Sequence, residues 1–230
     1  MKLAILVILN VAYYVWALLF VVYIFQRYLL MPMDTWKTSI QDFTVNRVAT
    51  WSIGIHWTAA ILVMLLGNIQ LFGFVRRMNI SLHRWNGRVY SFMGIITSIG
   101  GLLYIALRGC SGGISMILCF SLYGSTYLAS ILLTIYFART KNIVQHREWA
   151  IRAYTLGIGS LLYRLYILPL RLSITDDLPI EYAWLWLNIA GWVMFLPNIL
   201  IAEPYIWYTR KPRKSKLKSS VSSQALLQEE

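Results

Sequence analysis

Charged residues are scarce in this sequence, since Asp, Glu, Lys and Arg make up only 13% of its 230 residues. A typical soluble globular domain carries about 25%. The hydrophobic residues, at 58%, fall in long uncharged runs, and a small soluble core could not bury runs of this length. The combination excludes a soluble enzyme, a nucleic-acid-binding domain and a disordered chain. It predicts a multi-pass integral membrane protein.

Acidic residues are the scarcer of the charged types. The chain has 9 Asp and Glu against 21 Lys and Arg, which gives a formal net charge of +12. In a soluble chain this excess would suggest nucleic acid as a partner. Here the Lys and Arg residues lie at the ends of the apolar runs. We therefore expect the lipid bilayer and its anionic phospholipids as partners, and no nucleic acid.

Cysteine is also rare, with only Cys110 and Cys119 present. On a helix these two residues would be ~13 Å apart by rise alone, which is too far for a disulfide. The sequence has no CxxC pair and no His/Cys metal pattern. Cysteine usage therefore says nothing about the compartment.

Six long apolar runs occupy residues 1–209, at about 3–26, 48–75, 84–107, 110–138, 147–170 and 182–208. Each is near or above the ~20 residues that cross a hydrocarbon core. A backbone in lipid must satisfy its own hydrogen bonds, so we expect helices. The predicted fold class is all-α, a transmembrane bundle of six helices. A signal peptide is the alternative for the first run, but the run is too long and lacks a cleavage site.

The basic residues predict the orientation of the bundle. They concentrate in segments 76–88, 139–152 and 210–218, which must share one side of the membrane if there are six spans. The opposite side has the mixed segment 34–47 and the acidic segment 176–181. Both termini are therefore expected in the cytoplasm. Residues 210–230, basic and then rich in Ser and Gln, are predicted to be a disordered tail that binds anionic phospholipid or only fixes topology.

Three histidines are candidates for chemistry. We expect His83 in the first turn of the third helix, capped by Ser81, and His146 at a matching depth in the fifth helix, which starts near Asn142. Two histidines at one level on different helices are what an axial haem pair or a two-ligand metal site requires. His56 lies in the opposite half of the membrane. We expect it to be a hydrogen-bonded imidazole between helices.

Arginines follow both inner histidines and extend along their helices. Positive-inside topology and snorkelling explain Arg84 well and Arg152 less well. Arg164 lies about four turns into the fifth helix, where an arginine usually faces the bundle interior. Glu203 is the one acid embedded in an apolar run, and Arg152 or Arg88 could neutralise it. Glu148 could also pair with Arg152 at i,i+4.

A polar cluster is predicted on the cytoplasmic side of the bundle, with a role that is structural or functional, and its members are His83, Arg88, His146, Arg152 and Glu203. Gly87 would let a neighbouring group approach the helix that carries His83. The candidates for cofactor binding are His83, His146, Arg84, Arg88 and Arg152. The other members of the polar set are His56, Gln70, Tyr90, Arg164, Asn198 and Glu203.

Several of these residues fall in motifs that resemble a family of predicted membrane proteins, domain of unknown function 2306. The motifs are His83-Arg84-x-x-Gly87-Arg88-x-Tyr90, His146-Arg147-x-Trp149-x-x-Arg152, Pro197-Asn198-x4-Glu203, and His56 followed by Leu66-Gly67-x-x-Gln70. The resemblance covers about residues 50–208. The family has no established activity, so the resemblance implies a recurrent polar set without a known role.

A second resemblance is to ascorbate-reducible b-type cytochromes, in which six helices hold two haems. The resemblance implies that His83 and His146 form the pair between the third and fifth helices. The fourth helix has no histidine to pair with His56. At most one haem b is therefore expected, with its iron between His83 and His146.

Three functions remain open. The first is a membrane redox protein with one haem, whose propionates Arg84, Arg88 or Arg152 would hold. The second is an enzyme or binding protein for an anionic lipid or isoprenoid, in which a histidine or Glu203 works as acid or base. The third is a non-catalytic assembly factor. A transporter is not favoured, because the sequence shows no repeat and no pair of Gly/Pro-broken helices.

Overall fold

The computed structural model describes residues 2–36, 46–71, 73–173 and 180–210 of the chain. Within these residues every regular element is helical, which confirms the predicted all-α class. The α-helices are α1 Lys2–Ile24, α2 Arg47–Leu71, α3 Gly73–Met78, α4 Ile80–Arg108, α5 Gly113–Arg139, α6 Ile143–Gly157, α7 Gly159–Ser173, α8 Ile180–Val193 and α9 Leu196–Thr209. A π-helical turn, Phe25–Leu29, and a 3-10 turn, Met33–Thr35, follow α1. The predicted lipid-binding tail, beyond Arg210, and most of the acidic segment 176–181 lie outside the described residues.

Four segments of the described chain are long and apolar enough to cross a membrane. They are Arg47–Gln70, Ile80–Arg108, Gly113–Arg139 and Glu181–Thr209. A shorter apolar stretch, Asn10–Ile24, lies in α1. The chain is therefore an integral membrane protein, while the count of six spans and the orientation stay predictions.

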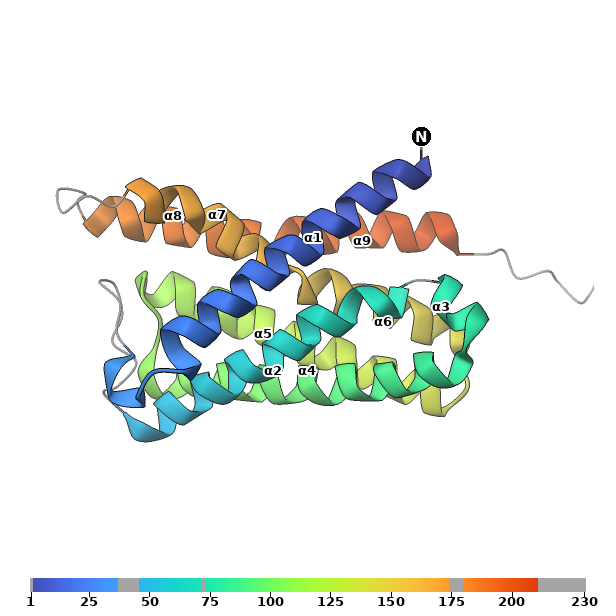
Figure 1. The fold of residues 1–230 in the computed structure, drawn as a ribbon, viewed down its shortest axis with the longest axis horizontal. Helices are drawn as coiled ribbons and strands as arrows, with labels where there is room; N and C mark the ends of the chain where they lie inside the picture. Colours follow the sequence, from blue (N-terminus) through green and yellow to red (C-terminus); the bar gives the residue numbers. More distant parts are fainter. Residues whose placement is uncertain (1, 37–45, 72, 174–179, 211–230) are drawn as a thin grey trace, which may run out of the picture.

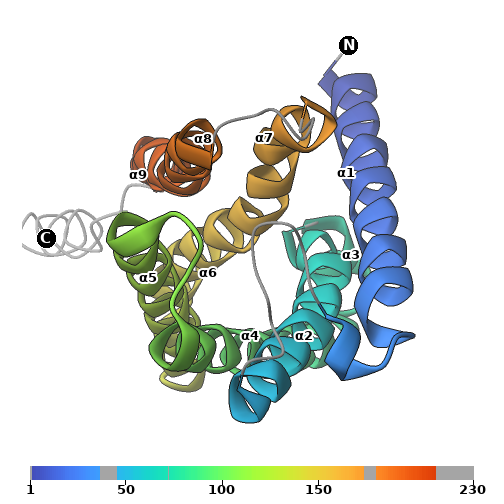
Figure 2. The same cartoon turned by 90° about the vertical axis from the view of Figure 1, so that its left-hand side faces the viewer.

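The helices form an elongated bundle (Figure 1). α2 and α4 pack along each other, α5 packs against α4 and α6, and α7 packs against α8. Seen along the bundle in Figure 2, α1 lies at one edge and the α8–α9 pair near the opposite edge. The start of α1, α3 and the end of α9 all lie at one end of the molecule in Figure 1.

Small residues bring α2 and α4 close together. A Cβ added at Gly100 of α4 would lie 2.8 Å from the backbone oxygen of Ser52 in α2. A Cβ added at the next residue, Gly101, would lie 2.9 Å from Nδ1 of His56. Membrane helices associate through such close backbone contacts, because lipid provides no hydrophobic force between them. These two glycines therefore determine how closely α4 packs against α2.

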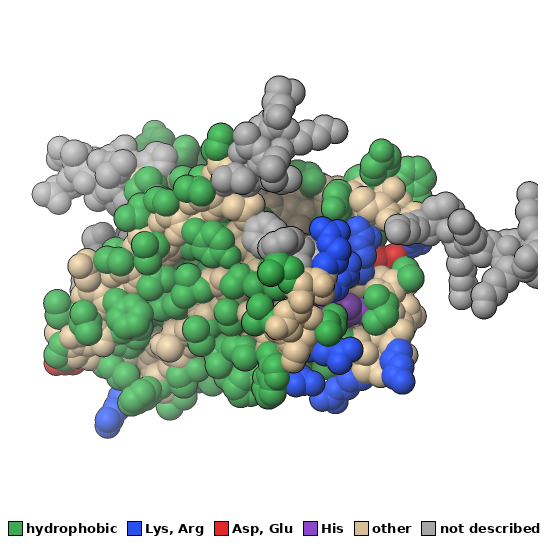
Figure 3. Space-filling view, turned by 45° about the vertical axis from the view of Figure 1, so that its right-hand side comes forward, with side chains coloured by type: hydrophobic (Ala, Val, Ile, Leu, Met, Phe, Trp, Pro, Cys, Tyr) green, Lys and Arg blue, Asp and Glu red, His purple; other side chains and the backbone are tan. Residues whose placement is uncertain are grey.

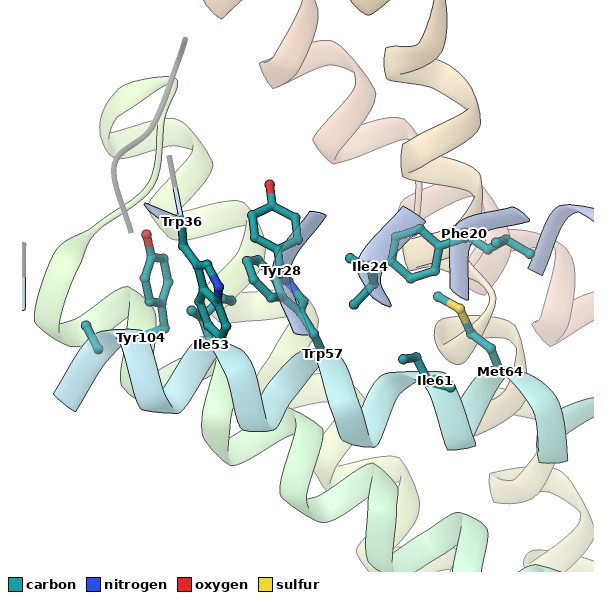
Figure 4. Packing of buried hydrophobic residues seen from close by; sticks show 11 residues of the cluster. Phe20, Ile24, Tyr28, Trp36, Ile53, Trp57, Ile61, Met64 and Tyr104 are labelled. Atoms are coloured by element: carbon teal, nitrogen blue, oxygen red, sulfur yellow. The ribbon is translucent and has the colours of Figure 1, made fainter. Parts of the chain in front are cut away.

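An aromatic cluster joins the connection after α1 to α2 (Figure 4). The ring of Trp57 lies 4.2 Å from that of Tyr28 and 5.6 Å from that of Trp36, measured between centroids. Trp36 is only 2% exposed, and a Cβ at Gly54 would lie 3.0 Å from its ring. The cluster therefore fixes the residues that precede α2 against the first half of that helix.

Two of the expected helices are each interrupted. The run at 147–170 contains α6 and α7, which meet at Ile158 between two glycines. The run at 182–208 contains α8 and α9, and Pro197 lies in the first turn of α9. Proline cannot donate the backbone hydrogen bond that would continue α8 into α9. The expectation that no pair of Gly/Pro-broken helices exists is therefore wrong.

Candidate functional site

Some of the polar candidates lie at the end of the bundle that is formed by α3, the starts of α4 and α6, and the end of α9. We call it the arginine end. Its basic side chains include Arg76, Arg77, Arg84, Arg88, Arg147, Arg152 and Arg210. Figure 3 shows Lys and Arg side chains gathered mostly at one end of a largely hydrophobic face, with a histidine among them.

An asparagine sets the start of α4 and the position of His83. The side chain of Asn79 accepts a hydrogen bond from the backbone N–H of Leu82 at 2.9 Å, and Asn79 has extended backbone angles. Ser81, the expected cap, lies inside the helix instead. Asparagine is among the best N-cap residues, so the helix begins earlier than predicted. His83 still falls in its first turn, as expected.

His146 is fixed in one tautomer at the start of α6. The helix starts near Asn142, as expected, and the Asn142 side chain caps it by accepting a hydrogen bond from the backbone N–H of Gln145 at 3.3 Å. Nδ1 of His146 lies 3.0 Å from the backbone oxygen of Thr134 in α5. A carbonyl oxygen can only accept, so Nδ1 carries the proton. In the neutral ring, Nε2 then holds a lone pair that can bind a metal or accept a proton.

His83 is held differently. Its backbone oxygen accepts a hydrogen bond from Nε2 of Gln70 at 3.0 Å, and the same Gln70 nitrogen would lie 3.3 Å from a Cβ at Gly87. Gly87 therefore permits the close approach that was expected. Nδ1 of the His83 ring is buried and has no hydrogen-bond partner within the described residues.

Two bidentate ion pairs join α6 to α9. Arg152 donates to both carboxylate oxygens of Glu203, at 2.6 and 2.7 Å, and is thus the partner among the two that were expected, Arg152 and Arg88. Arg210 donates to both oxygens of the buried Glu148 at 2.9 Å, and this carboxylate raises the pKa of Arg210. The predicted Glu148–Arg152 pair is therefore wrong, because each residue has a bidentate partner on α9. Arg147 also donates to the Thr209 hydroxyl at 2.8 Å.

The arginines of α3 and α4 have no such partners. Arg76, Arg77 and Arg84 are exposed, and the guanidinium of Arg88 lies 4.9 Å from the ring of Trp85 on its own helix. No ion pair to a carboxylate involves these four arginines within the described part of the chain. The α4 side of the arginine end therefore keeps its full positive charge, whereas two of the three arginines named on the α6–α9 side are paired with carboxylates.

His56 and Arg164 lie outside the arginine end. Nδ1 of His56 donates to the backbone oxygen of Thr97 at 2.6 Å, between α2 and α4, as expected of a hydrogen-bonded imidazole. The guanidinium of Arg164 lies 3.8 Å from the ring centre of Phe20 in α1 and donates to the backbone oxygen of Ser160. Neither residue contacts the two inner histidines.

The bundle interior holds a hydrogen-bonded set of tyrosines and asparagines that was largely missed. Tyr127 donates to the hydroxyl of Tyr90 at 3.4 Å. Tyr154 donates to the side-chain oxygen of Asn68, and Asn68 donates to that of Asn10 at 3.3 Å. Only Tyr90 was among the candidates. Interhelical hydrogen bonds of this kind hold membrane helices together.

Asn198 bridges the two helix breaks. Its side-chain nitrogen donates to the backbone oxygen of Thr155 in α6 at 3.1 Å and to that of Met194 at 2.8 Å. Asn198 is therefore separate from the arginine end. The motif that contains both residues therefore contributes Asn198 to the helix breaks and Glu203 to the ion pair with Arg152.

A haem at the arginine end would have to use His83 and His146. Within the described residues no three His, Cys, Asp or Glu side chains form a metal-binding group. A metal-ligating histidine almost always donates its second ring N–H to a partner. His146 meets this condition through Thr134. His83 does not, because its buried Nδ1 lacks a partner, so the residues fit a haem only in part.

Comparison with known proteins gives one family. The model of the family described as Predicted membrane protein (DUF2306) matches residues 53–206. This range contains both inner histidines, the Arg152–Glu203 pair and Asn198. No curated protein and no solved structure matches the chain.

Proposed function

The chain belongs to the family Predicted membrane protein (DUF2306), and from that premise we propose that it binds the anionic headgroup of a membrane amphiphile at its arginine end. The observation that carries the proposal is that, within the part of the chain described, arginines on the α6–α9 side are paired with carboxylates, whereas those on α3 and α4 are not. Both carboxylates of the α6–α9 side are used in ion pairs. The four arginines of α3 and α4 have no carboxylate partner among the described residues.

The surroundings of these arginines suit a lipid headgroup. Leu82 and Val89, which alternate with them on α4, are exposed apolar side chains. Arginine at such a boundary places its stem against acyl chains and its guanidinium at headgroup level. The planar guanidinium also matches the geometry of phosphate and carboxylate groups. An anion bound there would lie beside His83, which directly precedes Arg84 on α4.

The proposal includes the predicted topology, with six spans and both termini in the cytoplasm. Its support is that the three basic segments of the sequence meet at one end. The ion pair from Glu148 to Arg210 ties the second segment to the third, and α3, which carries Arg76 and Arg77 of the first segment, lies at the same end of the molecule in Figure 1. The start of α1 lies at the same end in Figure 1. Positive segments favour the cytoplasmic face.

A single-haem redox protein is the second candidate, and the His146–Thr134 hydrogen bond is the observation that favours it. His83 and His146 would hold the iron, and Arg84 or Arg88 the propionates, since Arg152 is already paired with Glu203. Haem would supply one-electron transfer. An assembly factor, the third candidate, needs no bound group at this end.

The test is lipid binding by the full-length protein in detergent, measured by native mass spectrometry. Phosphatidylglycerol and phosphatidylcholine are titrated separately, and the dissociation constants are compared for the Arg84→Gln/Arg88→Gln double variant and wild type. Each arginine near anionic lipid contributes about 1 kcal/mol. Two such losses weaken phosphatidylglycerol binding about thirtyfold. Phosphatidylcholine binding stays unchanged.

Arg108→Gln is the matched control, because Arg108 is the last residue of the same helix and lies at its other end. It should leave phosphatidylglycerol binding within about twofold of wild type. Equal binding by the double variant and wild type would overturn the proposal. An absorption spectrum before and after dithionite tests the haem candidate, which requires a Soret band that each of His83→Ala and His146→Ala alters.

A further inference from the structure

The two helix breaks lie against each other inside the bundle. A Cβ added at Gly159, the first residue of α7, would lie 3.0 Å from the backbone oxygen of Met194 at the end of α8. The same position would be 3.7 Å from the side-chain nitrogen of Asn198. The break between α6 and α7 and the break between α8 and α9 are thus at one level, and glycine permits their contact.

Side chains from other elements satisfy the carbonyls that the breaks free. Asn198 donates to Thr155 at 3.1 Å and to Met194 at 2.8 Å. The hydroxyl of Tyr123 in α5 donates to the backbone oxygen of Leu156 at 2.8 Å. Non-helical backbone is tolerated in a membrane protein only where neighbours supply such bonds. The breaks are therefore specific features of this sequence.

The segments on the two sides of the breaks pair separately. α6 pairs with α9 through the polar contacts of the arginine end. α7 pairs with α8 mainly through buried apolar side chains, among them Ile167, Ala183 and Leu187, with one hydrogen bond from Trp186 to the backbone of Tyr166 at 2.9 Å. In Figure 1, α7 and α8 lie together on one side of the breaks.

We propose that the paired breaks form a hinge, about which α7 and α8 move as one unit relative to α6 and α9. Hinges in proteins consist of a few element-terminal residues that absorb the change of backbone angles. Asn198 holds the hinge in the arrangement described here, because its side-chain amide donates a hydrogen bond at each of the two breaks. Movement of α7 and α8 away from α5 breaks the hydrogen bonds that Asn188 donates to Gly112 and Trp192 to Ser115, at 2.9 and 3.2 Å. The hinge is independent of what binds at the arginine end.

Distances between paired spin labels test the hinge in the full-length protein in nanodiscs. One pair joins Ile189 of α8 to Leu103 of α4, and the control pair joins Leu200 of α9 to Phe92 of α4. All four residues are exposed apolar positions, and each is replaced by cysteine in a background without the native cysteines. We expect a second distance population of about 10% for the Ile189–Leu103 pair. The control pair should give one narrow distribution.

Three variants should shift this population in a defined way. Asn198→Ala removes the hydrogen bonds at both breaks and should enlarge the second distance population several-fold. Pro197→Ala restores a backbone N–H that can join α8 to α9, and should therefore make the second distance population smaller. Asn86→Ala is the matched control. The side-chain amide of Asn86 in α4 donates to the backbone oxygen of Leu66 in α2 at 3.2 Å, away from both breaks.

The proposal is overturned if the Ile189–Leu103 distribution is as narrow as the control in wild type and Asn198→Ala. It is also overturned if Asn86→Ala broadens this distribution as much as Asn198→Ala. If Asn198→Ala does not fold, Pro197→Ala decides alone. A second population that Pro197→Ala leaves undiminished then contradicts the hinge.

Discussion

Replacing Gly100 with alanine tests the close packing of α2 and α4. The new Cβ would lie 2.8 Å from the backbone oxygen of Ser52 and 3.2 Å from the backbone nitrogen of His56. Ordinary van der Waals contacts of a Cβ are 3.4–4 Å. Because backbone atoms cannot rotate away, the two helices must separate by about 0.6 Å, the difference between 3.4 and 2.8 Å, to accept the substitution.

The energetic cost follows from two opposing effects. Overpacking a well-packed interface costs about 1–3 kcal/mol. Alanine recovers up to about 1 kcal/mol through its higher helix propensity. We therefore expect Gly100→Ala to lower the free energy of unfolding by about 1–2 kcal/mol.

Gly124→Ala is the matched control for this substitution. Its Cβ would meet only the side chain of Leu102, at 3.1 Å, and that side chain can change rotamer. This variant should therefore be neutral or slightly stabilising. The two variants should differ by about 2 kcal/mol, a roughly thirtyfold difference in the folding equilibrium.

Unfolding of both variants is followed by tryptophan fluorescence during titration of detergent-solubilised protein with a denaturing detergent. The free energies are compared with that of wild type under identical micelle composition. If Gly100→Ala is as stable as Gly124→Ala, α2 and α4 are not in the close contact described, and the account of this interface is wrong.

Three further predictions concern the ion pair, the aromatic cluster and the topology. A double-mutant cycle of Arg152→Gln and Glu203→Gln, measured by the same titration, should give a coupling of about 0.5–1 kcal/mol, because the pair is bidentate but partly solvent-exposed; zero coupling would contradict a direct pair. Trp36→Ala should lower the free energy of unfolding by at least about 3 kcal/mol, because the lost ring is buried; a cost below 1 kcal/mol would contradict the packing around it. A cysteine at Met31 should react with an impermeant maleimide in intact cells and one at Lys141 only after permeabilisation; the reverse pattern would contradict the proposed orientation.

The long helices could be predicted from the sequence because apolar runs and capping residues are local signals. The start of α6 near Asn142 was predicted in this way, and depth in the membrane suggested Arg152 or Arg88 as the partner of Glu203. The competing pair of Glu148 with Arg152 satisfied the i,i+4 rule equally well. Only the packing of α9 against α6 brings Arg210 to Glu148. Because Glu148 then has its own partner, Arg152 pairs with Glu203 and not with Glu148.

The helix breaks and the interior tyrosines could not be predicted in the same way. Glycines are common in membrane helices, so Gly157 and Gly159 alone do not predict a helix break. The close approach of the Met194 backbone to Gly159 exists only in the folded bundle. Tyrosine in an apolar run usually indicates an interfacial anchor. The burial of Tyr127 depends on Gly94, since a Cβ there would lie 3.2 Å from the tyrosine hydroxyl, and this pairing of distant residues exists only in the fold.

Photo-crosslinking with an anionic lipid that carries a diazirine beside its phosphate tests the central claim most directly. The full-length protein in nanodiscs is irradiated, digested and mapped by mass spectrometry. The account predicts adducts concentrated in residues 76–88, with loss of these adducts in the Arg84→Gln/Arg88→Gln variant. Adducts spread evenly along the helices, or concentrated near Arg108 at the other end of α4, would contradict it.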